Sequence, residues 1–194
     1  MKRCGMIQKA QSGKYGFAED DSIPKTIAAL IELVALMCAL WVLSFLSTLL
    51  HELGHALGYM LATVDRHWHI RVGWGKQLLN TKALTVNLLV FDGCFVPSEK
   101  KIDTTAKLIK TLSGGPAVSL LAVLGLLALR FGGTSFQSDI FADGVIEFFL
   151  NSALFINLFI LILSVLPIRY FHGEIKGLET DGLQMLRALK KRGD

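Results

Sequence analysis

The chain has few cysteines, few histidines and few charged residues, and each shortage excludes a class of protein. Its three cysteines, Cys4, Cys38 and Cys94, are odd in number and lack metal-ligand spacing, so they support neither a disulfide framework nor a cysteine zinc site. Five histidines are too few for a membrane di-iron hydroxylase or desaturase. Of the 194 residues, 19% are charged and 52% are hydrophobic, which argues against a soluble enzyme.

The few charges are segregated, and three long apolar runs lie between them. Residues 26–50 contain Glu32 and Cys38 as their only ionisable side chains and would extend roughly 37 Å as a helix. Two further runs cover 115–131 and 144–166. The first run follows about 25 other residues and exceeds the length of a secretion-signal core, so we do not expect it to be a cleaved leader. The sequence therefore predicts three transmembrane helices.

The distribution of lysine and arginine predicts how these helices are oriented. Both residues are frequent in 63–113 and after Leu166, and both are absent from 132–143. Because positive loops stay on the cytoplasmic side, the C-terminus is expected in the cytoplasm. We therefore expect a multi-pass protein of the plasma membrane. The net charge of +4 then reflects orientation in a lipid bilayer and does not indicate nucleic-acid binding.

The segments between the apolar runs predict a small β-region. Apolar and polar residues alternate in 69–75, and 83–91 is apolar and β-branched, with 76–82 as the connection and Asp92-Gly93 as a turn. We expect a mainly α-helical, polytopic membrane protein that forms one domain over 1–194. Its expected parts are a flexible segment at 1–24, helix 1 at 26–62, a β-hairpin or sheet at 66–96, a surface helix at 102–112, helix 2 at 115–131, helix 3 at 144–166, and a cytoplasmic tail at 167–194 that ends in an amphipathic helix.

The residues His51-Glu52-Leu53-Gly54-His55 carry the strongest chemical signal in the sequence. Two histidines four apart project from one face of a helix and can bind a single Zn²⁺. Glu52 lies beside them, where it can accept a proton from a water activated by the metal. Three ionisable groups in an apolar helix are costly unless they serve one another. The sequence therefore predicts one Zn²⁺ per chain, bound by His51 and His55, with Glu52 as the catalytic base.

A catalytic zinc site normally has three protein ligands, so a third is needed. His67 and His69 are close in sequence, but their place on a predicted strand directs them elsewhere. The other candidates follow the third apolar run and are His172, Glu174, Glu179 and Asp181. Asp181 is favoured because Gly182 follows it and allows a tight turn toward the ion. Glu179 and Glu174 remain alternatives.

Together these features resemble the site-2 protease family of intramembrane zinc metalloproteases, in a compact bacterial-type form. The resemblance rests on the His51–His55 motif, on Gly115-Pro116 at the start of the next helix and on Asp181-Gly182, and it covers roughly 47–186. It implies three core transmembrane helices, with a membrane-associated β-region between the first two. It also implies His51, His55 and Asp181 as zinc ligands and Glu52 as the catalytic base.

Two features depart from the pattern of that family. Its third helix usually carries an asparagine three residues before a proline, where this chain has Ser164 before Pro167. Asn157 lies two to three turns upstream of that proline and would face the interior. In many members only a few residues separate the proline from the aspartate, whereas thirteen separate Pro167 from Asp181 here. We take Asn157 and Ser164 as candidate substrate-binding residues.

The function that these residues predict is zinc-dependent hydrolysis of peptide bonds in a membrane-spanning protein or peptide. A substrate helix must unwind before it is cut, and the strand at 83–91 could hold it extended by β-augmentation, unless the hairpin is purely structural. The alternative is a catalytically inactive membrane scaffold of the same fold that binds a partner helix. The intact set of His51, Glu52 and His55 argues against that alternative, and zinc content would separate the two.

Overall fold

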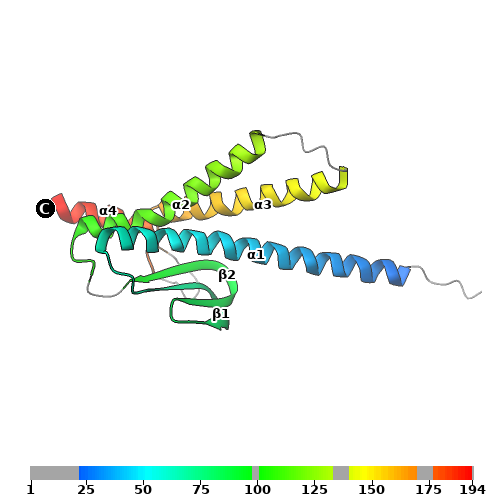
Figure 1. Ribbon diagram of the computed structural model, residues 1–194, viewed down its shortest axis with the longest axis horizontal. Helices are drawn as coiled ribbons and strands as arrows, with labels where there is room; N and C mark the ends of the chain where they lie inside the picture. Colours follow the sequence, from blue (N-terminus) through cyan, green and yellow to red (C-terminus); the bar gives the residue numbers. More distant parts are fainter. Residues whose placement is uncertain (1–21, 98–100, 133–139, 170–176, 194) are drawn as a thin grey trace, which may run out of the picture. The chain divides into compact units, whose positions relative to one another are not determined.

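The computed structural model describes residues 22–97, 101–132, 140–169 and 177–193. In these residues the chain forms four helices and two strands (Figure 1). The elements are α1 (Ser22–Thr63), β1 (Trp68–Asn80), β2 (Leu84–Pro97), α2 (Thr105–Phe131), α3 (Ile140–Val165) and α4 (Asp181–Gly193). Contacts divide the chain into two compact units, Met1–Leu36 and Met37–Asp194. The second unit contains all the packing described below.

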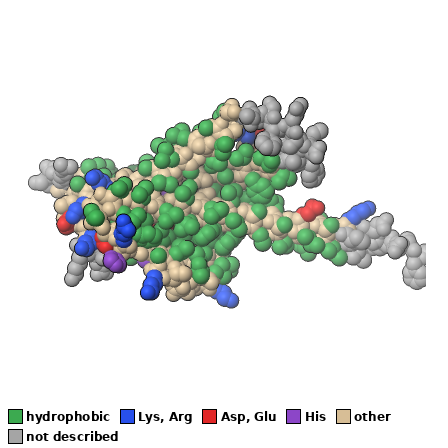
Figure 2. Space-filling view, viewed as in Figure 1, with side chains coloured by type: hydrophobic (Ala, Val, Ile, Leu, Met, Phe, Trp, Pro, Cys, Tyr) green, Lys and Arg blue, Asp and Glu red, His purple; other side chains and the backbone are tan. Residues whose placement is uncertain are grey.

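Three of the helices are long and apolar enough to cross a membrane, as the sequence predicts. These segments are Lys25–Thr63, Thr105–Phe131 and Gly144–Val165. Large apolar side chains on them, such as Leu121 and Phe155, are exposed. Hydrophobic side chains also cover much of the visible face over α2 and α3, whereas lysine and arginine gather around α4 and the sheet (Figure 2). Such a surface suits contact with lipid chains rather than with water.

The boundaries of the first and third helices match the prediction to within a few residues. The first was expected at 26–62 and is found at Ser22–Thr63, and the third was expected at 144–166 and is found at Ile140–Val165. The expected amphipathic helix in the tail is α4. The predicted flexible segment at 1–24 lies almost entirely outside the described residues.

The apolar core of the second unit lies between α1 and the sheet. Its buried residues come from both elements and are Ala56, Ile70, Val72, Val86 and Val90. Two side chains of α1 also hold the backbone of β2. The indole Nε1 of Trp41 donates to the Leu88 carbonyl oxygen at 2.6 Å, and the Thr48 hydroxyl donates to the Val90 carbonyl oxygen at 3.2 Å. The sheet is therefore attached directly to the helix that carries the histidine motif.

The two strands form an antiparallel sheet whose register shifts several times. Residues 68–72 lie opposite 93–97, and residues 70–72 also lie opposite 84–86. The later part of β1 lies opposite the earlier part of β2, with Gln77 facing Asn87. Gly73 and Gly75 allow the bend between these parts, because their φ angles of +78° and +84° are strained for other residues. A Cβ on Gly73 would also lie only 2.4 Å from the Leu89 carbonyl oxygen.

Two predicted boundaries in the β-region are wrong. The expected connection at 76–82 is largely strand, since β1 continues to Asn80, and the expected turn at Asp92-Gly93 lies inside β2. The chain reverses instead near Thr81, whose hydroxyl donates to the Leu84 carbonyl oxygen and accepts from its N–H. Gly93 serves another purpose, because a Cβ there would lie 2.3 Å from Oε1 of Glu52. The glycine makes room for the glutamate.

The predicted separation of a surface helix at 102–112 from a transmembrane helix at 115–131 is also wrong. α2 is continuous from Thr105 to Phe131, begins at the N-cap Thr104 and contains Pro116 in its interior. A proline inside a helix leaves one carbonyl without its usual N–H partner, which neighbouring helices in a membrane protein can compensate. The glycines before Pro116 therefore do not end a helix.

Those glycines allow α1 and α2 to approach until their backbones touch. A Cβ on Gly114 would lie 2.1 Å from the Gly54 carbonyl oxygen, and a Cβ on Gly54 would lie 2.4 Å from the Gly114 carbonyl oxygen. A Cβ on Gly58 would likewise lie 2.4 Å from the Lys110 carbonyl oxygen. Small residues at such a crossing are typical of membrane helix pairs. This contact brings α2 against the histidines of α1.

We predict that Gly114→Ala destabilises the metal-free protein, because the added methyl group must separate the two backbones. Overpacking of this kind costs about 1–3 kcal/mol. Gly125→Ala in the same helix is the matched control, since a Cβ there meets nothing within 4 Å, and alanine should stabilise that helix by up to about 1 kcal/mol. Thermal unfolding in detergent, followed by circular dichroism, measures both. Equal unfolding temperatures for the two variants would contradict the close contact.

Candidate metal centre

The two histidines of the motif lie on the inner face of α1 and are both buried. His51 is 6% exposed and His55 is 5% exposed. Their spacing of four residues brings the two imidazoles together, with 3.2 Å between the Nε2 atoms. The ring planes are nearly perpendicular, at 82°. Both rings therefore direct the same nitrogen toward one point.

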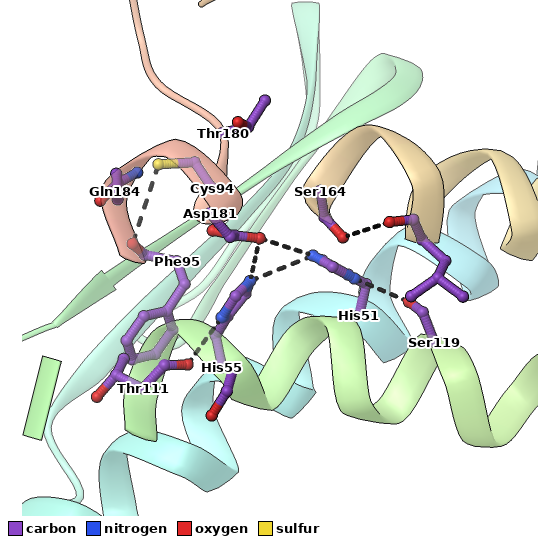
Figure 3. A network of polar contacts seen from close by, with 12 residues as sticks. His51, His55, Cys94, Phe95, Thr111, Ser119, Ser164, Thr180, Asp181 and Gln184 are labelled. Atoms are coloured by element: carbon purple, nitrogen blue, oxygen red, sulfur yellow. Dashed lines mark hydrogen bonds and ion pairs between the residues drawn. The ribbon is translucent and has the colours of Figure 1, made fainter. Parts of the chain in front are cut away.

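Asp181 reaches this point from the first residue of α4 (Figure 3). Its Oδ2 lies 3.4 Å from Nε2 of His51 and 3.2 Å from Nε2 of His55. The side chain is 17% exposed, so the carboxylate is largely shielded from solvent. Among the described residues, His51, His55 and Asp181 form a group that could hold a metal ion. These are the three residues that the family resemblance implies as zinc ligands.

The outer contacts of the imidazoles fix which nitrogen can bind a metal. Nδ1 of His55 lies 2.9 Å from the Thr111 carbonyl oxygen, which can only accept, so Nδ1 must carry the proton. In the neutral ring Nε2 is then unprotonated and available as a ligand. Nδ1 of His51 lies 2.8 Å from the Ser119 hydroxyl, which accommodates the same tautomer. Contacts of this kind orient the histidines of metal sites.

The space beside the two Nε2 atoms is kept open by Gly115 of α2. A Cβ on this residue would lie 2.3 Å from Nε2 of His55 and 2.7 Å from Nε2 of His51. Any side chain there would fill the cradle between the ligand atoms. The absence of a side chain at Gly115 therefore fits a group that holds an ion.

The electrostatics of Asp181 also suit a metal ligand. Burial by itself would raise the pKa of its carboxyl. In the metal-free protein, hydrogen bonds that protonated His51 and His55 donate through Nε2 outweigh burial and lower the pKa to about 2. The group is therefore a carboxylate at neutral pH. An anionic oxygen beside two imidazoles provides the charge that a divalent cation needs.

Glu52 lies next to this group and faces the same cavity. Its side chain is 5% exposed and packs against Gly93 of β2, whose backbone leaves room for it. The backbone of Phe95 hydrogen-bonds its carboxylate. A cavity of about 330 Å³ adjoins Glu52, both histidines and Asp181. A carboxylate in this place can exchange a proton with a molecule in the cavity.

The two residues predicted to bind substrate lie in different places. Ser164 lines the cavity, and its hydroxyl donates to the Leu161 carbonyl oxygen at 3.0 Å. Asn157 is not among the residues that line the cavity. Its Nδ2 donates to Ser47 Oγ of α1 at 3.0 Å and to the Ala153 carbonyl oxygen at 2.8 Å. Asn157 thus holds α3 against α1.

The other candidates for the third ligand are engaged elsewhere or lie outside the described residues. Glu179 forms ion pairs with Arg169 and Arg187. His172 and Glu174 fall among the residues that the structure does not describe. His67 pairs with Asp65 at 2.8 Å and its side chain is 91% exposed. His69 of β1 contacts Lys82 and Thr85, whereas His67 precedes the strand, and neither belongs to the ligand group.

Cys94 also lines the cavity, although it does not belong to the ligand group. Burial raises the pKa of its thiol. The neighbouring carboxylates of Glu52, Asp92 and Asp181 raise that pKa further. A thiol with a raised pKa stays protonated at neutral pH and is a poor metal ligand.

Sequence reasoning missed the residues that support the ligands. Ser119 and Thr111 orient the histidines, Thr180 precedes Asp181 in a fully buried position, and Gly93 accommodates Glu52. A serine or threonine in an apolar helix has no pattern that indicates its partner. The one available signal is position, because Ser119 follows Gly115 by one helical turn and so lies on the same face of α2.

No protein-family model, no curated protein and no solved structure matches the chain. The function must therefore be inferred from the geometry of the site.

We predict that Asp181→Ala removes most of the metal affinity of the purified protein. The loss should exceed the factor of about 10–100 that is typical for an outer hydrogen-bond partner. Glu179→Gln is the control, because it changes the neighbouring acidic residue without touching the ligand group. Competition against a chelator of known affinity, with protein free of histidine tags, measures both. Equal loss in the two variants would contradict the assignment of Asp181.

Ser119→Ala should weaken metal binding by about 10–100-fold, because His51 loses the partner that orients its ring. Ser113→Ala, at an exposed position of the same helix, should leave the affinity unchanged. The same chelator competition provides the comparison. If the Ser119 variant binds metal as tightly as the wild type, the contact does not position His51.

Proposed function

We propose that the protein is an intramembrane zinc endopeptidase of the site-2 protease type. The observation that supports this most is the convergence of two imidazoles and one carboxylate beside a cavity that Glu52 also faces. Two histidines and one carboxylate are a common ligand set for catalytic zinc, which keeps a fourth position open. A tetrahedral ion with ligands at 2.0–2.1 Å places them about 3.3–3.4 Å apart. The three separations here are 3.2, 3.2 and 3.4 Å.

The reaction that this arrangement supports is hydrolysis of a peptide bond. A bound Zn²⁺ would supply a Lewis acid that lowers the pKa of water and polarises the peptide carbonyl. Glu52 accepts a proton from the attacking water and later returns it to the amine that leaves. One water molecule is thereby added across the carbon–nitrogen bond, giving a carboxylate and an amine. Gly93 and the Phe95 backbone keep Glu52 in position for both transfers.

The surroundings of the site support a membrane substrate. The ligands His51 and His55 lie on a helix that is long and apolar enough to cross a bilayer. Ionisable groups in such a segment are costly and are usually functional. We propose that the substrate is a membrane-spanning protein or peptide, and that the protein resides in the plasma membrane with its C-terminus in the cytoplasm, where the positive charges around α4 belong.

The residues that line the cavity support a binding place for an unwound substrate that is more specific than the strand predicted at 83–91. The carbonyl oxygens of Leu88 and Val90, within the strand expected to bind substrate, already accept hydrogen bonds from Trp41 and Thr48 of α1. Later residues of β2 line the cavity instead, from Phe91 to Phe95 together with Pro97. We propose that an extended substrate segment lies along this later part of β2, next to Glu52.

Glu52→Gln should abolish cleavage while leaving the zinc content unchanged, because the amide cannot accept the proton. A loss of about 10²–10⁴-fold is typical for a general base. Single-span peptides with fluorescent labels at both ends, incubated with the protein in detergent and analysed by mass spectrometry, provide the assay. Glu32→Gln is the matched control, since Glu32 is exposed and lies in the other unit. Undiminished cleavage by the Glu52 variant would refute the catalytic role.

A further inference from the structure

We propose that Thr180 is a positioning residue for the metal centre. Its hydroxyl attaches the first turn of α4 to the segment that directly follows α3, residues 166–168, and thereby places the Asp181 carboxylate opposite the two histidines. The inference rests on the metal site of the proposed function, but it concerns a residue that does not itself contact the ion.

The Thr180 hydroxyl makes contacts on both sides of the junction between the helices. The residue is 3% exposed. Its single O–H proton is shared between the carbonyl oxygens of Leu166 and Ile168, in the segment that directly follows α3. The same oxygen accepts from the Ile168 N–H at 3.2 Å and from the Leu183 N–H of α4 at 3.4 Å. One donor and two acceptor sites are all that a hydroxyl offers, and each is used.

The backbone of Thr180 strengthens the same junction. Its N–H donates to the Ile168 carbonyl oxygen at 3.1 Å, and its carbonyl oxygen accepts from the Gln184 N–H at 3.0 Å. The second of these bonds is an early helical bond of α4, so Thr180 occupies the N-cap position. The capping residue of α4 is thus also the residue that binds the end of α3.

Gly182 restrains Asp181 from the other side. A Cβ there would lie 1.9 Å from the Val165 carbonyl oxygen, so α4 approaches α3 as closely as a glycine allows. The sequence prediction gave Gly182 the role of a tight turn, which is wrong because Gly182 lies within α4. Its small size matters instead. Asp181 therefore lies between Gly182, which contacts the end of α3, and Thr180, which contacts the segment that follows it.

The attachment of α4 by Thr180 matters because the three ligands come from different helices. His51 and His55 share one helix, whereas Asp181 comes from another helix more than a hundred residues later. Metal sites lose affinity when a ligand is misplaced by fractions of an ångström. Without the contacts at Thr180, the start of α4 could shift relative to α3, and the 3.2 and 3.4 Å separations would not hold.

The test compares Thr180→Val with Thr180→Ser. Valine has nearly the same shape but no hydroxyl, whereas serine keeps the hydroxyl. We expect Thr180→Val to weaken Zn²⁺ binding by about 10–100-fold, as for other residues that orient a ligand. Thr180→Ser should bind Zn²⁺ nearly as tightly as the wild type. If Thr180→Val does not yield folded protein by circular dichroism, Thr180→Ala removes the hydroxyl with less bulk and takes its place.

A double-mutant cycle with Asp181→Ala separates positioning from general stability. If Thr180 acts through Asp181, Thr180→Val should cause no further loss of Zn²⁺ affinity in the Asp181→Ala background. Equal losses in both backgrounds would show a purely structural role and overturn the inference. Unchanged affinity in Thr180→Val alone would overturn it too, while leaving the metal site intact. A wild-type protein that binds no Zn²⁺ would refute the proposed function and the inference with it.

Discussion

The structure depends on one constraint, which is that two buried histidines of an apolar helix and a largely shielded aspartate must satisfy one another. His51, His55 and Asp181 achieve this by directing two nitrogens and one oxygen toward a common point. Each isolated group would be expensive to bury in such surroundings, and a bound divalent cation would convert the mutual approach of three lone pairs into favourable bonds. The cost explains why so much of the fold surrounds this point.

The remaining architecture provides the close approach that the constraint demands. Glycines of α1 and α2 allow the two backbones to touch, which brings Ser119 and the Thr111 carbonyl within reach of the imidazoles. The sheet is held on α1 by Trp41 and Thr48, so that β2 passes Glu52 at Gly93. Contact with α3 then fixes the start of α4. α1, α2, β2 and α4 all contribute residues to the site, and no single segment contains it.

Much of the candidate site could be predicted from the sequence, because its strongest signals are local. Predicting the histidine pair requires only the spacing of four residues in a helix. Predicting the three apolar helices requires only the length of the apolar runs. Asp181 was also identified, although the reason given for Gly182 was wrong. The strand boundaries, the continuity of α2 and the roles of Ser119 and Thr180 could not be predicted, since they depend on contacts between residues far apart in the chain. In a sequence, a glycine usually indicates a turn. Only the residues packed against it in the structure show that its small size is what allows them to approach.

The most direct test of the proposed zinc site is X-ray absorption spectroscopy at the zinc edge of purified, tag-free protein. We expect nitrogen and oxygen neighbours alone at about 2.0–2.1 Å, with the multiple-scattering pattern of two imidazoles. A sulfur neighbour at about 2.3 Å would instead indicate ligation by Cys94 and would contradict the proposed ligand set. The absence of the imidazole pattern would contradict it equally.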